Sequence, residues 1–124
     1  MDFAKLLRSF IPGFVGIGYV LRTEQNMRIH AFVTIGVVLA GWYFRLSAVE
    51  WIAVVLCIGG VTAAEAINTA VERLADRVTE EHDELVKHAK DTAAASVLLL
   101  SIAAVVVGAI VFLPKLITLF HDGS

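Results

Sequence analysis

The chain has 124 residues, of which 58% are hydrophobic and 18% are charged, and its formal net charge is −2. This length allows a single domain, and the apolar composition excludes an ordinary soluble domain and indicates an integral membrane protein. The nearly balanced charge gives no basic excess of the kind that nucleic-acid-binding proteins carry, so we expect no nucleic-acid partner.

Residues 1–22 are predicted to form an amphipathic helix on the membrane surface. Apolar residues recur at intervals of three and four from Phe3 to Leu21, and Lys5 and Arg8 accompany the first of them. This pattern is typical of a helix that lies on an anionic membrane surface. The dipeptide Pro12-Gly13 is expected to kink or interrupt the helix.

Three apolar segments follow a polar hinge, and each is about 20 residues long, enough to cross the hydrocarbon core of a bilayer. We predict transmembrane helices at 29–49, 51–71 and 93–113 and a charged loop at 73–91. Pro114 is expected to end the last helix. The predicted fold class is an all-α integral membrane protein with one surface helix and three transmembrane helices.

Positive charge predicts the topology. Eight of the ten Lys and Arg residues lie before the first span or between the second and the third, whereas Arg45 and Lys115 fall on the other side. By the positive-inside rule, the amino terminus and the 73–91 loop lie in the cytoplasm, where ATP is available. We therefore expect a multi-pass membrane protein with both of these regions on the cytoplasmic side.

The second span carries a stripe of polar residues, Glu65, Asn68, Glu72 and Asp76, whose spacing places them on one face of a helix. An ionisable group inside an apolar span costs ~2.5–3.5 kcal/mol, so it is rarely left without a partner or a task. Within the stripe, the two carboxylates of Glu65 and Glu72 and the carboxamide of Asn68 on one face indicate a site for a divalent cation and a proton transfer.

Two further polar groups lie at the same cytoplasmic boundary, namely Lys90-Asp91 and the hinge residues Glu24, Asn26 and Arg28. Mg²⁺ prefers oxygen ligands, usually one or two carboxylates with substrate phosphates, and Glu24 and Glu72 can supply those carboxylates. Lys90 can pair with phosphate oxygens. Glu65 lies deeper by a helical rise of ~10 Å, where a general base would meet the hydroxyl of a lipid head group.

Other interpretations remain open at this point. Glu65 and Asn68 can bond across helices in the core of an oligomer, and the charged run 73–84 can be a solvated loop. Glu65 can also be a proton relay in a small oligomeric channel or transporter subunit. The four histidines lack the spacing of zinc ligands, and no Walker or protein-kinase signature is present, so phosphoryl transfer requires an unrelated architecture.

Three blocks of sequence resemble the prokaryotic diacylglycerol kinase family. They are Glu24-x-Asn26-x-Arg28-Ile29-His30, Glu65-x-x-Asn68-Thr69-Ala70-Val71-Glu72-x-x-x-Asp76 and Lys90-Asp91-x-Ala93-Ala94. With the three-span plan, the resemblance covers nearly the whole chain, and it implies a location in the bacterial cytoplasmic membrane. The residues of the first two blocks are most similar to the Gram-positive branch of the family, whose members are undecaprenol kinases. This resemblance implies transfer of the ATP γ-phosphate to undecaprenol. The alternative substrate is diacylglycerol, whose phosphorylation gives phosphatidic acid.

The resemblance also implies a homotrimer with active sites between subunits and a requirement for Mg²⁺. It makes Glu65 the catalytic base and Glu24 and Glu72 the magnesium ligands, supported by Asn68, Asp76, Asn26 and Arg28. The nucleotide would contact Lys5, Glu24, Glu72, Glu81, His82, Asp83, Lys90 and Asp91. The lipid would contact Ser9, Glu65 and Ala94.

Two further observations bear on these expectations. Pro12, Gly13 and Met27 depart from the residues that are usual in the family, which affects the expected contacts of the surface helix. Small residues on one face of the third span favour close helix packing, as a trimer needs. They are Ala93, Ala94, Ser96, Ser101, Ala104 and Gly108.

Overall fold

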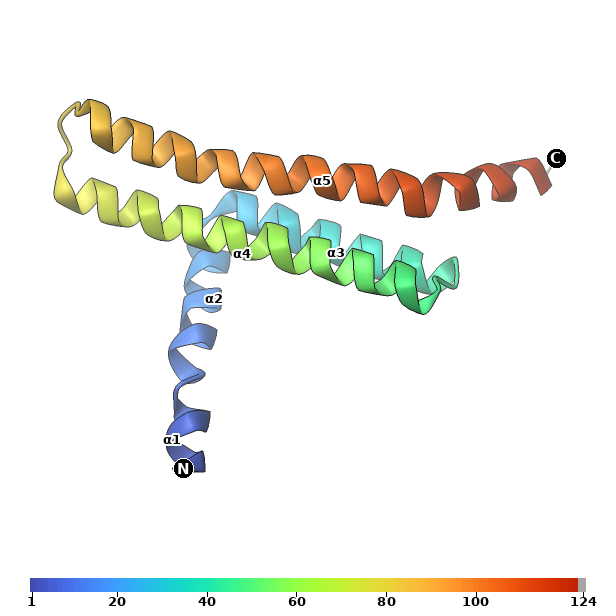
Figure 1. The fold of residues 1–124 in the computed structure, drawn as a ribbon, viewed down its shortest axis with the longest axis horizontal. Helices are drawn as coiled ribbons and strands as arrows, with labels where there is room; N and C mark the ends of the chain where they lie inside the picture. The colour runs from blue at the N-terminus through green and yellow to red at the C-terminus, as the bar shows by residue number, and fades with distance from the viewer. Residues whose placement is uncertain (123–124) are drawn as a thin grey trace.

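The computed structural model describes residues 1–122, and over this range the chain forms five α-helices (Figure 1). They are α1 (Phe3–Arg8), α2 (Ile11–Thr23), α3 (Gln25–Tyr43), α4 (Ala48–Val78) and α5 (Glu84–Asp122). The last three lie side by side, whereas α1 and α2 form an arm that projects sideways from them.

The arm is interrupted, as predicted, but at Ser9 and Phe10 instead of at Pro12-Gly13. Pro12 lies in the first turn of α2, where a missing N–H removes no helical hydrogen bond, so it begins a helix instead of breaking one. Asp2 caps α1, because its carboxylate accepts a hydrogen bond from the backbone N–H of Lys5 at 3.1 Å.

A sharp corner joins the arm to α3. Glu24 has an extended backbone, with φ −114° and ψ 116°, and it both ends α2 and begins α3. The Arg28 guanidinium donates hydrogen bonds from Nη1 to the carbonyl oxygens of Leu21 (3.0 Å) and Arg22 (2.9 Å). These are carbonyls at the end of α2 that have no helical partner, so Arg28 stabilises the corner.

The predicted span 29–49 is a single helix only as far as Tyr43, because a turn separates α3 from α4. Arg45 adopts φ 53° in this turn, and the backbone N–H of Leu46 donates to the carbonyl of Gly41 at 3.1 Å. Ser47 and Glu50 then form a reciprocal capping box that begins α4.

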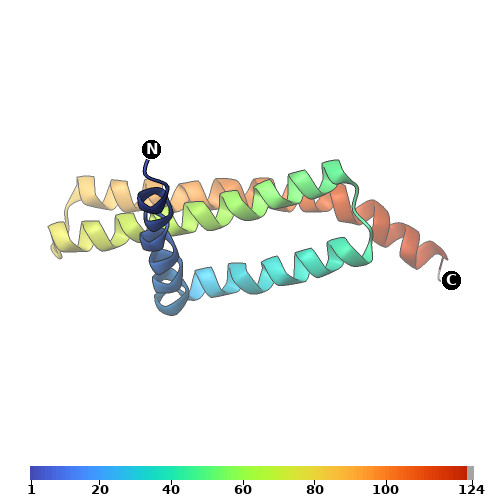
Figure 2. The same cartoon turned by 90° about the horizontal axis from the view of Figure 1, so that it is seen from below.

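The core of the bundle lies near this turn. Leu46, Val54 and Val111 are buried together, and Val37, Trp51, Ile58, Val107 and Phe112 pack around them. At the same end, Lys115 of α5 pairs with Glu50 of α4 at 2.9 Å. Figure 2 shows α3 running alongside α4 from the arm to the turn, with α5 behind α4. The α3 helix contacts this core through Val37, in the middle of the helix.

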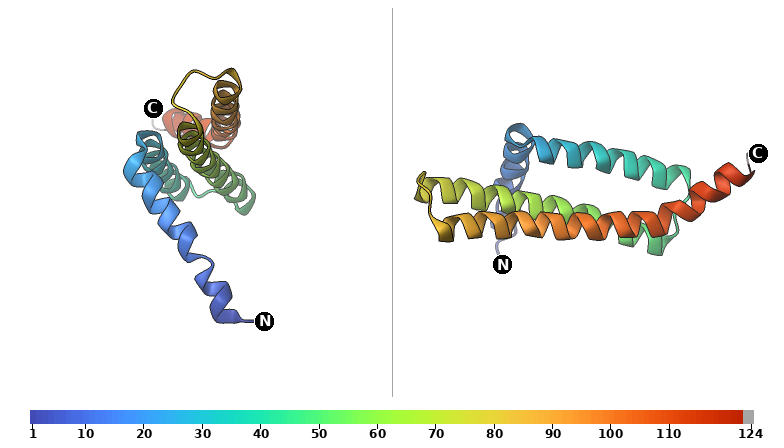
Figure 3. Two further views of the ribbon diagram at one scale, coloured as in Figure 1. Left: turned by 90° about the vertical axis from the view of Figure 1, so that its left-hand side faces the viewer. Right: turned by 90° about the horizontal axis from the view of Figure 1, so that it is seen from above.

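Two helices continue beyond their predicted limits. The predicted loop 73–91 is helical except at 79–83, because α4 runs to Val78 and α5 begins at Glu84. Charged residues support these polar turns, as in the pair formed by Lys87 and Asp91 at 2.8 Å. Pro114 does not end the last helix; it lies inside α5, which bends toward its end (Figure 3).

Three segments are long and apolar enough to cross a membrane, Phe3–Thr23, Ala48–Val78 and Glu84–Asp122. The predicted spans 51–71 and 93–113 lie within the last two. The first segment is the predicted surface helix, and α3 does not qualify. Polar residues at the start of α3, such as Gln25, Asn26 and Arg28, lower its mean hydropathy.

Candidate functional site

The predicted polar stripe lies on one face of α4, and its deepest members are buried within the single chain. Glu65 is 2% exposed, Asn68 7% and Thr69 2%. The Asn68 side-chain amide donates to the Glu72 carboxylate at 3.3 Å, one helical turn further along. The Thr69 hydroxyl donates to the backbone carbonyl of Glu65 at 2.9 Å. The helical spacing that predicted this face is therefore confirmed by a direct contact along it.

Exposure increases steadily along the stripe. Glu65 and Asn68 are buried, Glu72 is half-buried and Asp76 is exposed. Asp76 forms an ion pair with Lys90 of α5 at 2.7 Å. The stripe thus leads from the interior of the bundle to the polar ends of α4 and α5.

The Glu65 carboxylate has a neighbour on α3 that the sequence analysis did not assign to the site. His30 Nε2 lies 3.6 Å from Glu65 Oε2. The spacing of the four histidines does not predict a zinc site, and it indicates no other role for His30. The signal that pointed to His30 was its position at the end of the Glu24-x-Asn26-x-Arg28 block.

A polar pocket of about 430 Å³ lies between the ends of α4 and α5. It brings together six of the eight residues predicted to contact the nucleotide, together with Asp76 and Ala94. The six are Glu72, Glu81, His82, Asp83, Lys90 and Asp91. They come from the end of α4, the short loop and the first turns of α5. Because both signs of charge meet here, the pocket can receive an anion that carries a divalent cation.

Lys5 and Glu24, the other two predicted nucleotide contacts, do not line this pocket. Lys5 is exposed on α1 of the arm. The Glu24 carboxylate forms an ion pair with the Arg73 guanidinium, which also donates to the Tyr19 hydroxyl at 2.9 Å. Arg73 was not predicted to have a site role, and it ties the arm to α4.

The remaining supporting residue of the hinge, Asn26, is exposed, and no side-chain hydrogen bond joins it to the described residues.

The donor atoms beside the polar pocket fit a magnesium ion. Within residues 1–122 there is no group of three or more His, Cys, Asp or Glu side chains placed to hold a metal. Mg²⁺ does not require one, because one or two carboxylates and substrate phosphates usually suffice. The Glu72 carboxylate is half-buried, and the neighbouring Asn68 Oδ1 is a buried oxygen with no hydrogen-bond partner in the described chain. Both are the hard oxygen donors that this ion prefers.

The residues predicted to contact the lipid lie on separate elements. Ser9 lies at the break in the arm, where its hydroxyl donates to the Leu6 carbonyl at 2.5 Å. Glu65 is buried in α4, and Ala94 lines the polar pocket. A single chain therefore does not bring these three residues together.

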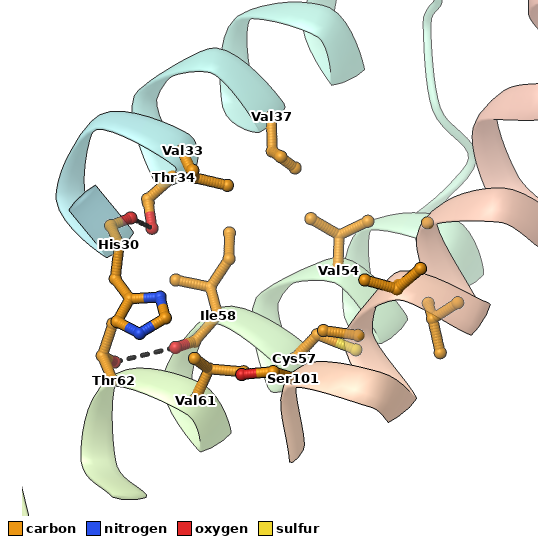
Figure 4. A pocket seen from close by; sticks show the side chains of 14 residues that line it. His30, Val33, Thr34, Val37, Val54, Cys57, Ile58, Val61, Thr62 and Ser101 are labelled. Atoms are coloured by element: carbon orange, nitrogen blue, oxygen red, sulfur yellow. Dashed lines mark hydrogen bonds between the residues drawn. The ribbon is translucent and has the colours of Figure 1, made fainter. Parts of the chain in front are cut away.

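Two apolar hollows lie next to the stripe. One, of about 390 Å³, lies between α3, α4 and α5, and His30 lies at its edge (Figure 4). The other, of about 970 Å³, lies between the arm, α3 and α4 and extends to Thr69 and Arg73. Pro12, Gly13 and Met27, the three departures from the family pattern, all line the second hollow.

These features define a helical membrane protein in which a buried carboxylate is connected to a polar pocket at the ends of two long helices. The chain belongs to the prokaryotic diacylglycerol kinase family, whose family model matches residues 13–112. It is a lipid kinase and a multi-pass bacterial membrane protein. Family membership thus favours the kinase interpretation over the channel or transporter subunit.

Two relatives illustrate the range of the family. The chain is 38% identical to undecaprenol kinase of Bacillus subtilis (strain 168) over 112 residues, which are 90% of this chain and 91% of the relative. It is 40% identical to diacylglycerol kinase of Synechocystis sp. over 116 residues, which are 93% of this chain but 66% of that relative.

Proposed function

We propose that this lipid kinase transfers the γ-phosphate of ATP to undecaprenol and forms undecaprenyl phosphate. The observation that carries the proposal is the stripe on α4, which runs from the buried Glu65 to the polar pocket at Lys90. Undecaprenol is preferred as substrate because the undecaprenol kinase relative matches this chain over 91% of its length. Diacylglycerol is the alternative, supported by the 40% identical relative.

The arrangement of the helices supports a position in the bilayer. In this proposal the arm lies on the cytoplasmic surface, and α3, α4 and α5, which lie side by side in Figure 1, cross the membrane. Arg73 of α4 contacts both Tyr19 and Glu24, so the arm meets α4 at that level. The ends of α4 and α5 project beyond the arm into the cytoplasm, with the polar pocket between them. Glu65 lies about two turns below Arg73, ~12 Å by helical rise, among the hydrocarbon chains.

In this proposal the two substrates bind at opposite ends of the stripe, the lipid alcohol at Glu65 and ATP at the polar pocket. The lipid alcohol places its terminal hydroxyl at Glu65, whose carboxylate takes the proton. The hydroxyl oxygen attacks the γ-phosphorus, a new P–O bond forms, and the bond to the leaving ADP breaks. Lys90 offsets charge on the phosphates, because phosphoryl transfer depends mainly on positioning and electrostatic stabilisation.

Glu72 and Asn68, with Glu24 once it is released from Arg73, are the residues that would hold Mg²⁺. When bound, the ion supplies positive charge to the phosphates. The two i, i+4 partners Asn68 and Glu72 already lie between Glu65 and the polar pocket.

A homotrimer completes the site in this proposal. Ser9, Glu65 and Ala94 are separated within one chain, so a neighbouring subunit is needed to bring the predicted lipid contacts together. The small-residue face of α5 supports the trimer less than expected. Ser101, Ala104 and Gly108 line the hollow between α3, α4 and α5 of their own chain.

A paired lipid assay tests the proposed function. Purified protein receives MgATP with either undecaprenol or diacylglycerol, and ATP consumption and product mass are measured together. We expect undecaprenyl phosphate to form with the higher kcat/KM. Faster formation of phosphatidic acid would transfer the assignment to diacylglycerol, and ATP consumption without either product would reject the proposal.

A further inference from the structure

Within residues 1–122, His30 is the one side chain within ion-pair or hydrogen-bond distance of the Glu65 carboxylate, with Nε2 3.6 Å from Oε2. The Glu65 side chain is 3% exposed and the His30 side chain 23%. Thr69 also contacts Glu65, but its hydroxyl donates to the backbone carbonyl and leaves the carboxylate alone. The orientation of this buried carboxylate therefore depends on a residue of another helix.

The distance between the two groups is informative. An ordinary N–H···O hydrogen bond spans about 2.7–3.2 Å, so at 3.6 Å the imidazole lies beside the carboxylate without a full hydrogen bond to it. The carboxylate oxygens then keep lone pairs that can accept a hydrogen bond from a substrate hydroxyl. A buried carboxylate with no partner would lower the stability of the protein, and its side chain would be free to rotate.

The same imidazole lies at the edge of the apolar hollow between α3, α4 and α5 (Figure 4). The hydroxyls of two threonines that line this hollow donate hydrogen bonds to the backbone of their own helices. Thr34 donates to the His30 carbonyl and Thr62 to the Ile58 carbonyl, each at 2.7 Å. Neither hydroxyl reaches Glu65. His30 thus connects the start of α3 to the carboxylate on α4.

We propose that His30 is a positioning residue for the lipid kinase reaction, which holds the Glu65 carboxylate in the orientation that meets the hydroxyl of the lipid alcohol. The inference rests on the proposed function, because it takes Glu65 as the base. His30 itself exchanges no proton with the substrate in this scheme. It acts through Glu65, and the start of α3 therefore contributes to turnover as well as to packing.

A spectroscopic experiment tests the contact without using activity. The chain contains four histidines. The full-length protein is labelled with ¹⁵N at histidine, and the ring signals that disappear in His30→Gln identify His30. We expect these signals to shift in Glu65→Gln and to stay in place in Ser101→Ala, a control on α5 that lines the same hollow. Unchanged His30 signals in Glu65→Gln would overturn the proposal whatever the activity of the protein.

Kinetics test the role in turnover. We expect His30→Ala to lower kcat with the lipid alcohol by about ten- to a hundredfold, because small misplacement of a catalytic group has effects of this size. His30→Gln should restore part of kcat, since its amide can still donate toward the carboxylate. The KM for ATP should change less than twofold, because His30 does not line the polar pocket proposed for the nucleotide.

The outcomes separate the two proposals. A wild-type kcat in His30→Ala, or a loss that appears only in the KM for ATP, would overturn the role of His30 while leaving the lipid kinase assignment intact. If His30→Ala fails to fold, the kcat of His30→Gln tests the role instead. A wild-type kcat in His30→Gln would then overturn the role of His30. Wild-type protein that makes no phosphorylated lipid would contradict the proposed function, and with it the role of His30 in turnover.

Discussion

In the polar pocket, the ammonium group of Lys90 lies opposite the carboxylates of α4, and we assign it to the phosphates and Glu72 to the magnesium ion. Lys90 of α5 contacts Asp76 of α4 at 2.7 Å, and both side chains line the pocket. An ammonium group held between two helices can exchange its carboxylate partner for a phosphate oxygen without a large movement. Glu72 lies deeper on the same face of α4 and contacts Asn68.

Replacing Lys90 tests the phosphate contact. Lys90→Met keeps most of the side-chain volume and removes the charge, so we expect kcat/KM for ATP to fall about ten- to a hundredfold, the cost of one or two charge-assisted hydrogen bonds. Lys115→Met is the matched control, since Lys115 also forms an ion pair on α5 but at the far end of the bundle. Equal effects of the two substitutions would contradict a specific contact.

Replacing Glu72 tests the magnesium site. Glu72→Gln keeps the shape of the side chain and removes its charge, so we expect the Mg²⁺ concentration for half-maximal activity to rise about tenfold or more. The measurement is a magnesium titration at saturating ATP, with Asp122→Asn at the distant end of α5 as control. The same titration curve for wild type and Glu72→Gln would remove Glu72 from the proposed ligands.

The predictability of the site differs from residue to residue. Helical spacing predicted the face that joins Asn68 to Glu72, because that contact is local in sequence. The ion pair of Glu24 with Arg73 and the contact of His30 with Glu65 join different helices. Such contacts depend on how α2, α3 and α4 cross, and the spacing within one helix carries no information about that.

At the scale of the helices, the long apolar segments predicted the second and third spans, which lie within α4 and α5, but not the ends of these helices. The end of an apolar segment marks the membrane boundary, whereas a helix ends where its backbone hydrogen bonds are capped. For this reason α4 continues for several polar residues to Val78. The start of α4, by contrast, has a local signal in its capping box, Ser47 with Glu50.

Removing that cap gives a prediction for stability. Ser47→Ala should lower the free energy of unfolding by about 1 kcal/mol, because the backbone N–H of Glu50 loses its acceptor. The change should appear as a lower Tm of the purified protein in detergent. Ser101→Ala, inside α5, serves as a control, and a wild-type Tm in Ser47→Ala would contradict the cap.

Gly41 and Gly36 on α3 form a matched pair for testing the α3–α4 packing. A Cβ at Gly41 would lie 2.7 Å from the Trp51 ring and 3.0 Å from Leu46, whereas a Cβ at Gly36 has no neighbour within 4 Å. Gly41→Ala should therefore destabilise the protein by about 1–3 kcal/mol through overpacking. Gly36→Ala should keep or raise the Tm, since alanine favours helix. A lower Tm for Gly36→Ala than for Gly41→Ala would contradict this packing.

At the scale of the whole molecule, many large apolar side chains are exposed, as in a protein that faces lipid, and the predicted site residues lie on several helices. The arm carries Ser9 and Lys5, far from the polar pocket that holds the other predicted nucleotide contacts. In the proposed trimer, the arm of one subunit would lie beside another subunit and bring these residues to its site. The sequence supports helix packing, but the number of subunits does not follow from it.

Cross-linking in bilayers tests this assembly. We expect bands up to three chains, at protein-to-lipid ratios low enough to exclude random collisions. A chain that remained monomeric under these conditions and still phosphorylated the lipid at the wild-type rate would contradict the shared site. A preparation treated with denaturant before cross-linking controls for contacts of unfolded protein.

The central claim is that the Glu65 carboxylate, buried in the hydrocarbon region, takes the proton of a lipid alcohol. The most direct measurement is the turnover of Glu65→Gln with saturating MgATP and undecaprenol, beside the rise in Tm that MgATP causes in the same variant. We predict that turnover falls at least about a hundredfold, the usual contribution of a general base, while MgATP still stabilises the protein as in wild type. Turnover at the wild-type level in Glu65→Gln would contradict the claim.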